Sequence, residues 1–295
     1  MRVNPNPVPD LLAALNRTRQ DTQEALLELS SGRRVNQPSD DPAASAILVQ
    51  NHDQAIFTAR YLQSLSSIQG QFQTADSALN SMILAMQRAL TLGVQGANGT
   101  LSDTDRAAVA AELQGIQDQL ISLANTSFQG RPLFAGTMTS SPPFVKDNTF
   151  PSGVRYDGNG AVNTVQIGDG YQIAVNKPGS QLFVTPGHDI FQAMTGLVQA
   201  MQSNTGFTAA MISLRDTFDY VSGQRVFYGN TMNQAQAQSN YLGTAKLQLS
   251  QQENTLAAAD IEAAASRLVN SQNATNATLA AVGRISQLSL FDFLR

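Results

Sequence analysis

The sequence predicts a mainly α-helical protein: a long antiparallel helical bundle and coiled coil formed by both halves of the chain, with a small central β-rich insert. Two observations support this fold class. Amphipathic helical patterns with sustained heptads occupy both ends of the chain. The segments with strand-like patterns lie in one stretch rich in glycine and proline, between about residues 136 and 188. Such a layout favours a fold that is closed by pairing the two ends of the chain.

The clearest heptad repeat runs through the C-terminal half. Apolar residues recur there at strict sevens, and Met211, Phe218 and Met232 occupy the interleaved position. A helix of about fifty residues is a rod on the order of 75 Å long, and it needs partners along its whole length. The residues at the strict sevens are Phe207, Leu214, Val221, Tyr228, Ala235, Leu242, Leu249 and Leu256.

The N-terminal half supplies matching helices. An apolar stripe with alternating spacings of four and three runs from Tyr61 to Met86, and a second stripe runs from Val109 to Leu123. The glycine-rich segment 93–99 between them favours a chain reversal over a helix, and residues 102–105 have capping-box spacing. We therefore predict three antiparallel rods over 43–92, 103–125 and 207–256, with a further helix over 189–203.

Each terminus carries a weaker helical stripe. The C-terminal stripe has Thr275 at a seam position, and Ile261 lies five residues after Leu256, which moves the stripe by about 140° around the helix. Because such polar seams are marginal in isolation, we expect residues 1–40 and 258–295 to be poorly ordered until a partner covers them. The residues predicted to form this assembly and chaperone-binding surface are Val8, Leu11, Leu12, Leu15, Leu26, Leu29, Leu268, Leu279, Val282, Ile285, Leu288, Leu290, Phe291, Phe293 and Leu294.

Three domains are predicted from these patterns. Residues 1–42 and 257–295 form a terminal coiled-coil assembly domain, residues 43–138 and 189–256 form a helical rod domain, and residues 139–188 form an outer β-rich insert. Short strands are expected over 154–156, 164–167, 171–175 and 182–184, because turn residues separate these runs. About fifty residues provide little core, so we expect the insert to pack on the helices.

Composition excludes several classes of protein. The chain has 295 residues with no cysteine, which excludes disulfides, thiolate catalysis and thiolate metal sites. Absence of cysteine suits a protein exported unfolded through a narrow channel, although a chain rich in small residues can also lack cysteine by chance. The formal net charge of −4 argues against general nucleic-acid binding. No run of about 18 apolar residues is available to span a membrane, and the first residues do not form a secretory signal.

A loop between the first two predicted helices carries a distinctive set of polar residues. Gly32 can end the preceding helix in a left-handed conformation, and Asp41 followed by Pro42 is a favoured order for starting the next helix. Arg33 and Arg34 are expected to be exposed. The residues assigned to this inter-domain loop are Gly32, Arg33, Arg34, Pro38, Asp40, Asp41 and Pro42.

No residue pattern indicates an enzyme. Asp40 and Asp41 could form a catalytic carboxylate pair, but adjacent carboxylates at a helix start are far more often caps. His52 and His188 have no cysteine or histidine at ligand spacing, which argues against a metal site. The glycines of residues 153–160 lack the Gly-Lys-Ser/Thr of a phosphate-binding loop. We therefore predict no catalytic residues, no cofactor and no metal.

Four segments resemble the flagellin and hook-associated protein superfamily. Residues 30–44 resemble its N-terminal signature, and their ending Pro-Ser-Asp-Asp-Pro-Ala-Ala is closer to the hook-filament junction members than to filament flagellins. Residues 129–137 are similar to the passage that leads into the variable domain, although Arg131-Pro132 replaces a more usual acidic or apolar pair. Residues 255–261 resemble the start of the last helix, and residues 288–294 resemble the closing segment of the junction members.

The resemblance implies a structural adapter of the bacterial flagellum, which forms a junction ring between a hook-side hook-associated protein and the flagellin filament. It implies export in an unfolded state through the flagellar type III apparatus, without a cleavable signal peptide, to an extracellular position. It also implies an export chaperone that covers the C-terminal region in the cell. The expected partners are further copies of this chain, the hook-side protein, flagellin and the chaperone, with no nucleic acid and no membrane.

Three alternatives remain open from the sequence. A short flagellin would share the same helical ends and would polymerise alone. A secreted effector or enzyme on a helical scaffold would need a convergent polar pocket. An export translocator would interact with membranes, and the lack of an apolar hairpin argues against it.

Overall fold

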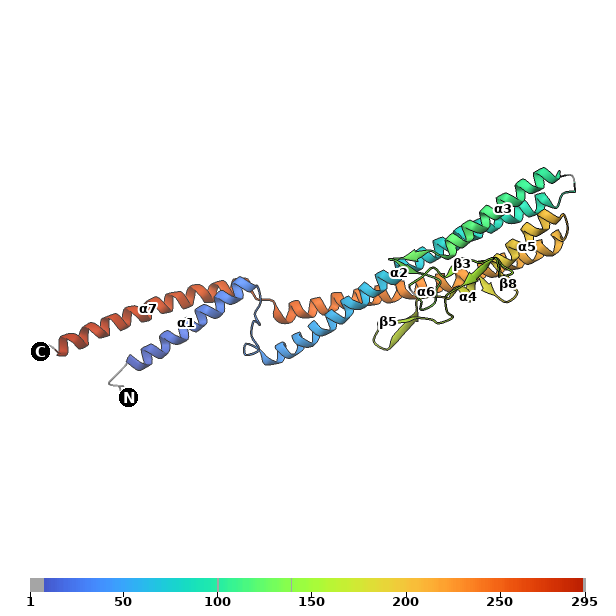
Figure 1. Cartoon of the computed structure of the whole chain (residues 1–295). Helices are drawn as coiled ribbons and strands as arrows, with labels where there is room; N and C mark the ends of the chain where they lie inside the picture. Colours follow the sequence, from blue (N-terminus) through green and yellow to red (C-terminus); the bar gives the residue numbers. More distant parts are fainter. Residues whose placement is uncertain (1–7, 100, 139, 294–295) are drawn as a thin grey trace. The chain divides into compact units, whose positions relative to one another are not determined.

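The computed structural model describes residues 8–99, 101–138 and 140–293, and most of them are helical (Figure 1). The chain divides into two compact units, formed by the described parts of residues 1–57 with 244–295 and of residues 58–243. The predicted mainly α class is confirmed. The long helices are α1 (Val8–Ser31), α2 (Pro42–Gly96), α3 (Asp103–Ala124), α5 (Ile190–Ser203), α6 (Phe207–Ala257) and α7 (Ile261–Phe293).

Local capping chemistry sets several helix ends. The Ser102 hydroxyl accepts a hydrogen bond from the Asp105 N–H at 3.2 Å at the start of α3. The Asp189 carboxylate accepts hydrogen bonds from two N–H groups in the first turn of α5, each at 2.9 Å. Asn204 ends α5 in the left-handed region, with φ 55°. The three predicted rods and the helix over 189–203 therefore agree with α2, α3, α6 and α5 to within a few residues.

The core of the 58–243 unit follows the predicted heptads. Five of the residues at strict sevens on α6 are buried, and they share one apolar core with the α2 stripe that includes Leu65, Phe72 and Met86. The Phe72 and Tyr228 rings meet edge to face, with centroids 5.9 Å apart. The buried residues of the α6 repeat are Leu214, Val221, Tyr228, Ala235 and Leu242.

The predicted chain reversal over residues 93–99 begins too early. Helix α2 continues through Gly93 and ends at Gly96. A Cβ atom on Gly93 would lie 2.2 Å from the Met211 Sδ, and a Cβ atom on Gly96 would lie 2.1 Å from the Met201 side chain. These two glycines therefore serve close helix packing, and the reversal occupies only the residues after Gly96.

The strands form four separate antiparallel hairpins. The pairs are β1 (Ser127–Phe128) with β2 (Arg131–Pro132), β3 (Phe144–Lys146) with β4 (Val154–Tyr156), β5 (Thr164–Gly168) with β6 (Tyr171–Ala174), and β7 (Val184–Thr185) with β8 (His188–Asp189). A short helix, α4 (Gly179–Leu182), precedes β7.

The predicted limits of the β-rich stretch, about 136 to 188, and one predicted strand were wrong. The β1–β2 hairpin lies before residue 136, because Gln129 and Gly130 both adopt positive φ and reverse the chain there. The expected strand over 182–184 is replaced by the end of α4 and the start of β7, since Leu182 and Phe183 pack into the core from a helical turn. The strands predicted at 154–156, 164–167 and 171–175 correspond to β4, β5 and β6.

The strand-containing segment shares its core with the helices, as expected from its small size. The Asn125 side chain at the end of α3 donates to the Phe144 carbonyl at 2.7 Å and accepts from the Phe144 N–H at 2.9 Å. The Phe144 ring lies 5.3 Å from the Phe191 ring of α5, measured between centroids. None of the helices in the described residues combines the length and the hydropathy that a bilayer-spanning segment requires.

Candidate assembly surface

Helices α1 and α7 lie side by side within the 1–57/244–295 unit (Figure 1). The contact is built mainly from small and polar residues. Leu15 and Ala25 are buried on α1, and Ala264 and Ser271 are buried on α7. Among the described side chains of α1 and α7, Leu15 is the one large apolar residue that is buried, so this part of the pair buries little apolar surface for its length.

Polar bonds connect the two helices across this seam. The Thr22 hydroxyl donates to the Ser271 hydroxyl at 3.0 Å. The Arg267 guanidinium forms an ion pair with the Glu28 carboxylate, with one bond at 3.1 Å, and the Glu28 residue is only 8% exposed. A nearly buried carboxylate needs such a partner, so this ion pair favours the observed alignment of α7 against α1.

Several of the predicted surface residues are exposed on this pair. Leu12 is 49% exposed, Leu26 is 53% exposed and Leu279 is 46% exposed. Leu11, Leu29, Leu268 and Val282 are partly buried, and Leu15 is buried in the α1–α7 contact. The apolar residues thus divide between an internal seam and an outward surface, which the unit itself leaves uncovered.

The predicted residues at the extreme ends are placed only in part. Val8, Ile285, Leu288, Leu290, Phe291 and Phe293 belong to α1 or α7 by their backbone, but their side chains are not among those described. Leu294 lies outside the described residues.

Sequence analysis missed exposed apolar residues on other helices of the same unit. Ile47, Val49 and Phe57 on α2 and Leu247 on α6 are all exposed within the same unit, between 46% and 66%. The sequence pattern could have identified them, because they are large apolar residues at helix positions off the main heptad stripe. Exposed apolar residues in this unit are therefore not confined to the two terminal helices.

The loop after α1 is held by backbone bonds to the break between α6 and α7. Gly32 adopts φ 67° and ends α1, and its N–H donates to the Glu28 carbonyl at 2.9 Å. The Ala259 N–H donates to the Gly32 carbonyl at 3.0 Å, and the Arg34 N–H donates to the Ala257 carbonyl at 2.7 Å. A short antiparallel bridge therefore joins the two segments where both lack helical partners.

The two arginines of this loop make specific contacts although both are exposed. The Arg33 guanidinium binds the Glu253 carboxylate at 3.1 Å. The Arg34 guanidinium donates to the Asp41 carboxylate at 3.1 Å and to the Leu256 carbonyl at 3.0 Å. Arg34 thereby connects the start of α2 to the end of α6, where a cation is favourable.

The adjacent carboxylates of the loop act as caps. Asp40 Oδ2 accepts hydrogen bonds from the N–H groups of Asn36 and Gln37, at 2.9 and 2.8 Å. Asp41 Oδ1 accepts from the Ala44 N–H at 2.9 Å, and Pro42 occupies the first position of α2 as predicted. Pro38 is exposed in the turn that precedes Asp41.

These hydrogen bonds favour the charged form of both carboxyls. The backbone N–H of Gln37, followed by that of Asn36, holds the pKa of Asp40 below its usual range. The Ala44 N–H, followed by the Arg34 side chain, lowers the pKa of Asp41. Both groups remain ionised near neutral pH, which suits capping and not proton transfer.

The described residues contain no group of three or more histidine, cysteine or acidic side chains arranged to hold a metal ion. His52 is exposed on α2, and His188 stacks on Tyr220 with ring centroids 4.6 Å apart. Neither histidine therefore has companions for a metal site within the part of the chain that is described.

Comparisons with known proteins agree with this architecture. Residues 9–139 match the model of the bacterial flagellin N-terminal helical region. The chain is 37% identical over 158 residues to the flagellar hook-associated protein 3 of Salmonella typhimurium, covering 53% of this chain and 48% of that protein. It is also 25% identical over 296 residues to the flagellin of Bacillus subtilis strain 168, covering 97% of each.

A solved structure assigned to a flagellar hook-associated protein of Vibrio parahaemolyticus has the same fold. The TM-score is 0.66 at 22% identity, covering 73% of this chain and 98% of that one. The chain spans about half the length of the hook-associated relatives that it matches at 34–37% identity. Those relatives are structural proteins of the flagellum.

Proposed function

We propose that the chain is a member of the flagellin and hook-associated protein superfamily and acts as a structural adapter of the bacterial flagellum, which the matches to the flagellin N-terminal region and to hook-associated protein 3 support. It forms a ring of identical copies between a hook-side hook-associated protein and the flagellin filament. The observation that carries this proposal is the set of exposed apolar residues on α1, α7 and the parts of α2 and α6 in the same unit. The contact between α1 and α7 is itself formed mainly by small and polar residues. Such an exposed apolar surface requires neighbouring chains.

The three predicted segments have distinct roles in this proposal. Residues 1–42 and 257–295 form the inner assembly domain, in which α1 and α7 order fully when neighbouring copies cover them. Residues 43–138 and 189–256 form the next layer of the tube, and residues 139–188 face outward. The proposal assigns no catalytic role to Asp40 and Asp41, because both carboxylates accept backbone hydrogen bonds as caps.

Export precedes assembly in the same proposal. The chain passes unfolded through the flagellar type III apparatus and reaches the extracellular end of the hook, and a chain without cysteine forms no disulfide that would block that passage. Before export, a chaperone covers the C-terminal helix, where Leu279 is exposed and Val282 is partly exposed. This cover prevents premature self-association of the apolar surface.

A short flagellin is the second candidate, and the match to Bacillus subtilis flagellin over nearly the whole chain favours it. Purified full-length protein added to isolated hooks separates the two. An adapter adds a short ring to the hook-side protein and stops, and it remains soluble without hooks. A flagellin, once seeded, elongates into filaments whether or not hooks are present, and these filaments sediment. Continuous filaments of this chain alone would overturn the adapter proposal.

A further inference from the structure

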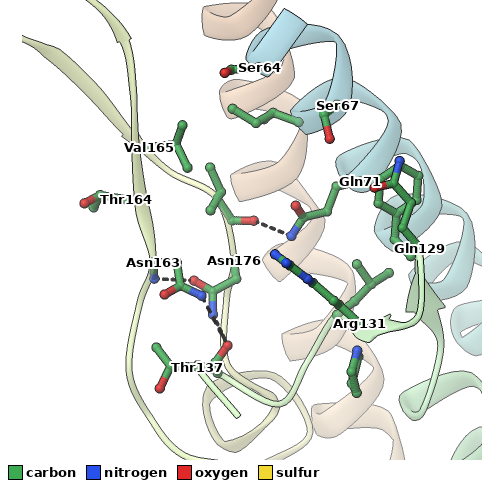
Figure 2. A pocket seen from close by; sticks show the side chains of 16 residues that line it. Ser64, Ser67, Gln71, Gln129, Arg131, Thr137, Asn163, Thr164, Val165 and Asn176 are labelled. Atoms are coloured by element: carbon green, nitrogen blue, oxygen red, sulfur yellow. Dashed lines mark hydrogen bonds between the residues drawn. The ribbon is translucent and has the colours of Figure 1, made fainter. Parts of the chain in front are cut away.

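A polar cavity of about 560 Å³ lies between α2 and the strand-containing segment (Figure 2). Ser64, Ser67 and Gln71 line it from α2, and Arg131 lines it from β2. The β5 hairpin closes the opposite side through Thr164. Cavities of this size are typical of sites that take a small group or a side chain.

The cavity holds one cation and no matching anion. Arg131 is the one ionisable side chain among the described lining residues, and Figure 2 shows it extended toward Gln71 and Asn176. Within the described part of the chain its guanidinium has no hydrogen bond or ion pair, whereas Arg155 and Arg225 each bind aspartates. A planar guanidinium can bind a carboxylate with two parallel bonds, so a carboxylate from another chain would suit this position.

Hydrogen bonds fix the walls of the cavity without any ligand. The Gln71 side chain donates to the Val175 carbonyl at 3.0 Å. Asn176 is 4% exposed, accepts from the Asn163 N–H at 2.6 Å and donates to the carbonyls of Gly136 and Ala161 at 3.1 and 3.2 Å. A site whose walls are already ordered loses little entropy when it is filled.

An exposed carboxylate lies at the tip of the β5–β6 hairpin. Asp169 lies between Gly168 and Gly170, and Gly170 adopts φ 67° to turn the hairpin. Asp169 is exposed and has no hydrogen bond or ion pair with the described residues. The hairpin projects from the helices in Figure 1, where it is labelled β5.

Asp169 cannot fill the cavity of its own chain. Thr164 and Val165 at the base of β5 line the cavity, and a strand rises about 3.3 Å per residue, so the tip lies roughly 13 Å away along a paired strand. The same geometry presents the tip to a second copy. A contact between the tip of one copy and the base of the next is heterologous, and such contacts generate rings when the rotation closes.

We propose that the Arg131 cavity binds the Asp169 carboxylate of a neighbouring copy, so that the insert hairpins link successive subunits. This contact rests on the proposed ring function, and it names a specific ion pair within it. Charge reversal tests the pair. Arg131→Glu or Asp169→Arg alone should lower incorporation into the hook-filament junction by about tenfold, and the double variant should recover most of it.

Two controls accompany the reversals. Arg215→Glu removes an exposed arginine outside the cavity and should leave incorporation unchanged. Thermal unfolding should be the same for all variants, because Arg131 and Asp169 are both exposed. Arg131→Gln, which removes the charge without reversing it, should show an intermediate loss. Unchanged incorporation in both single reversals, or a double variant no better than either, would overturn the pair.

A cross-linking measurement separates this inference from the proposed function. The chain has no cysteine, so Arg131→Cys and Asp169→Cys proteins can be mixed and joined with a short bis-maleimide, both on hooks and in concentrated solution. A mixed dimer supports the contact in either setting, even if wild-type protein is absent from the junction. If no mixed dimer forms either on hooks or in concentrated solution, the proposed contact is overturned. Free glucuronate serves as a small-molecule carboxylate probe. If the monomer binds it, and Arg131→Glu abolishes that binding while assembly is unaffected, the occupant is not a neighbouring copy and the proposal is overturned.

Discussion

The N–H of Arg34 donates a 2.7 Å hydrogen bond to the carbonyl of Ala257, the last residue of α6. This bond joins the loop after α1 to the break before α7, within one compact unit. The Arg34 guanidinium reinforces it by binding Asp41 at the start of α2. The loop therefore joins the end of α1 to the break before α7, and its carboxylates give it a pH dependence.

The order of the loop should be lost in acid. Asp40 and Asp41 have pKa values below the ordinary 3.8, chiefly because the N–H groups of Gln37 and Ala44 bind their charged forms. A carboxyl with a lowered folded pKa stabilises the fold above the unfolded pKa and stops doing so as the pH falls through the folded value. Amide protection at Ala44 should therefore persist from pH 7 down to about pH 4 and be lost as the pH falls below that value.

The matched variant is Asp41→Asn, which should make exchange at Ala44 faster at neutral pH and less sensitive to acid. Asp103→Asn, at an exposed position in the first turn of α3, is the control and should leave the loop unchanged. Protection of Ala44 that persists unaltered to about pH 2 would contradict the capping role.

Arg106 should contribute more to stability than any exposed arginine of the bundle. Its guanidinium is 7% exposed and donates to the Asn204 side chain at 2.7 Å and to the Leu101 carbonyl at 3.0 Å. Arg106→Ala leaves these acceptors without a partner and should lower the free energy of unfolding by about 1.5–3 kcal/mol. Arg88→Ala, which breaks a half-exposed pair with Glu112, should cost less than about 1 kcal/mol. Equal losses in thermal unfolding would contradict this ranking.

Residues 1–40 and 258–295 should exchange their amides rapidly in the free monomer. The α1–α7 seam relies on Ala25, Ala264 and Ser271, and a helical pair with so little apolar burial is marginal without neighbours. Exchange monitored by mass spectrometry should show protection over 58–243 and little over the two ends. Slow exchange across both terminal segments of monomeric protein would contradict assembly-coupled folding.

Replacing Val282 and Ile285 together with Asp should weaken both chaperone binding and ring assembly. Each lost burial forfeits about 1.5–3 kcal/mol, and an uncompensated carboxylate adds to that cost. Calorimetry with the chaperone and assembly on hooks measure the two effects, while thermal unfolding of the 58–243 unit should be unchanged. Ser266→Asp with Asn270→Asp places the same charges at exposed α7 positions and serves as the control. Normal binding and assembly in the Val282 and Ile285 variant would exclude this surface as the contact.

The buried faces of the long helices could be predicted wherever large apolar residues repeat. The sevens from Leu214 to Leu242 predicted the buried face of α6, because large side chains at that spacing have one way to leave water. The caps at Ser102 and Asp41 were equally readable, since their hydrogen bonds involve residues three positions away.

The sequence was less informative where small residues decide the packing. Gly93 and Gly96 are typical of a turn, yet they are helical because Met211 and Met201 occupy the space of their missing side chains. Ile261 was expected on the α7 stripe and is exposed, whereas Ala264 is buried in the contact with α1. Small residues in the contact let α1 and α7 approach closely. A prediction based on large apolar residues therefore identifies the outward surface of the pair and not its internal contact.

Electron microscopy of cells that lack this chain tests the adapter role most directly. The adapter account predicts complete hooks without filaments, with unassembled flagellin released into the medium, and recovery of filaments when the intact gene is returned. Filaments of normal length on the hooks of the deletion strain would contradict it.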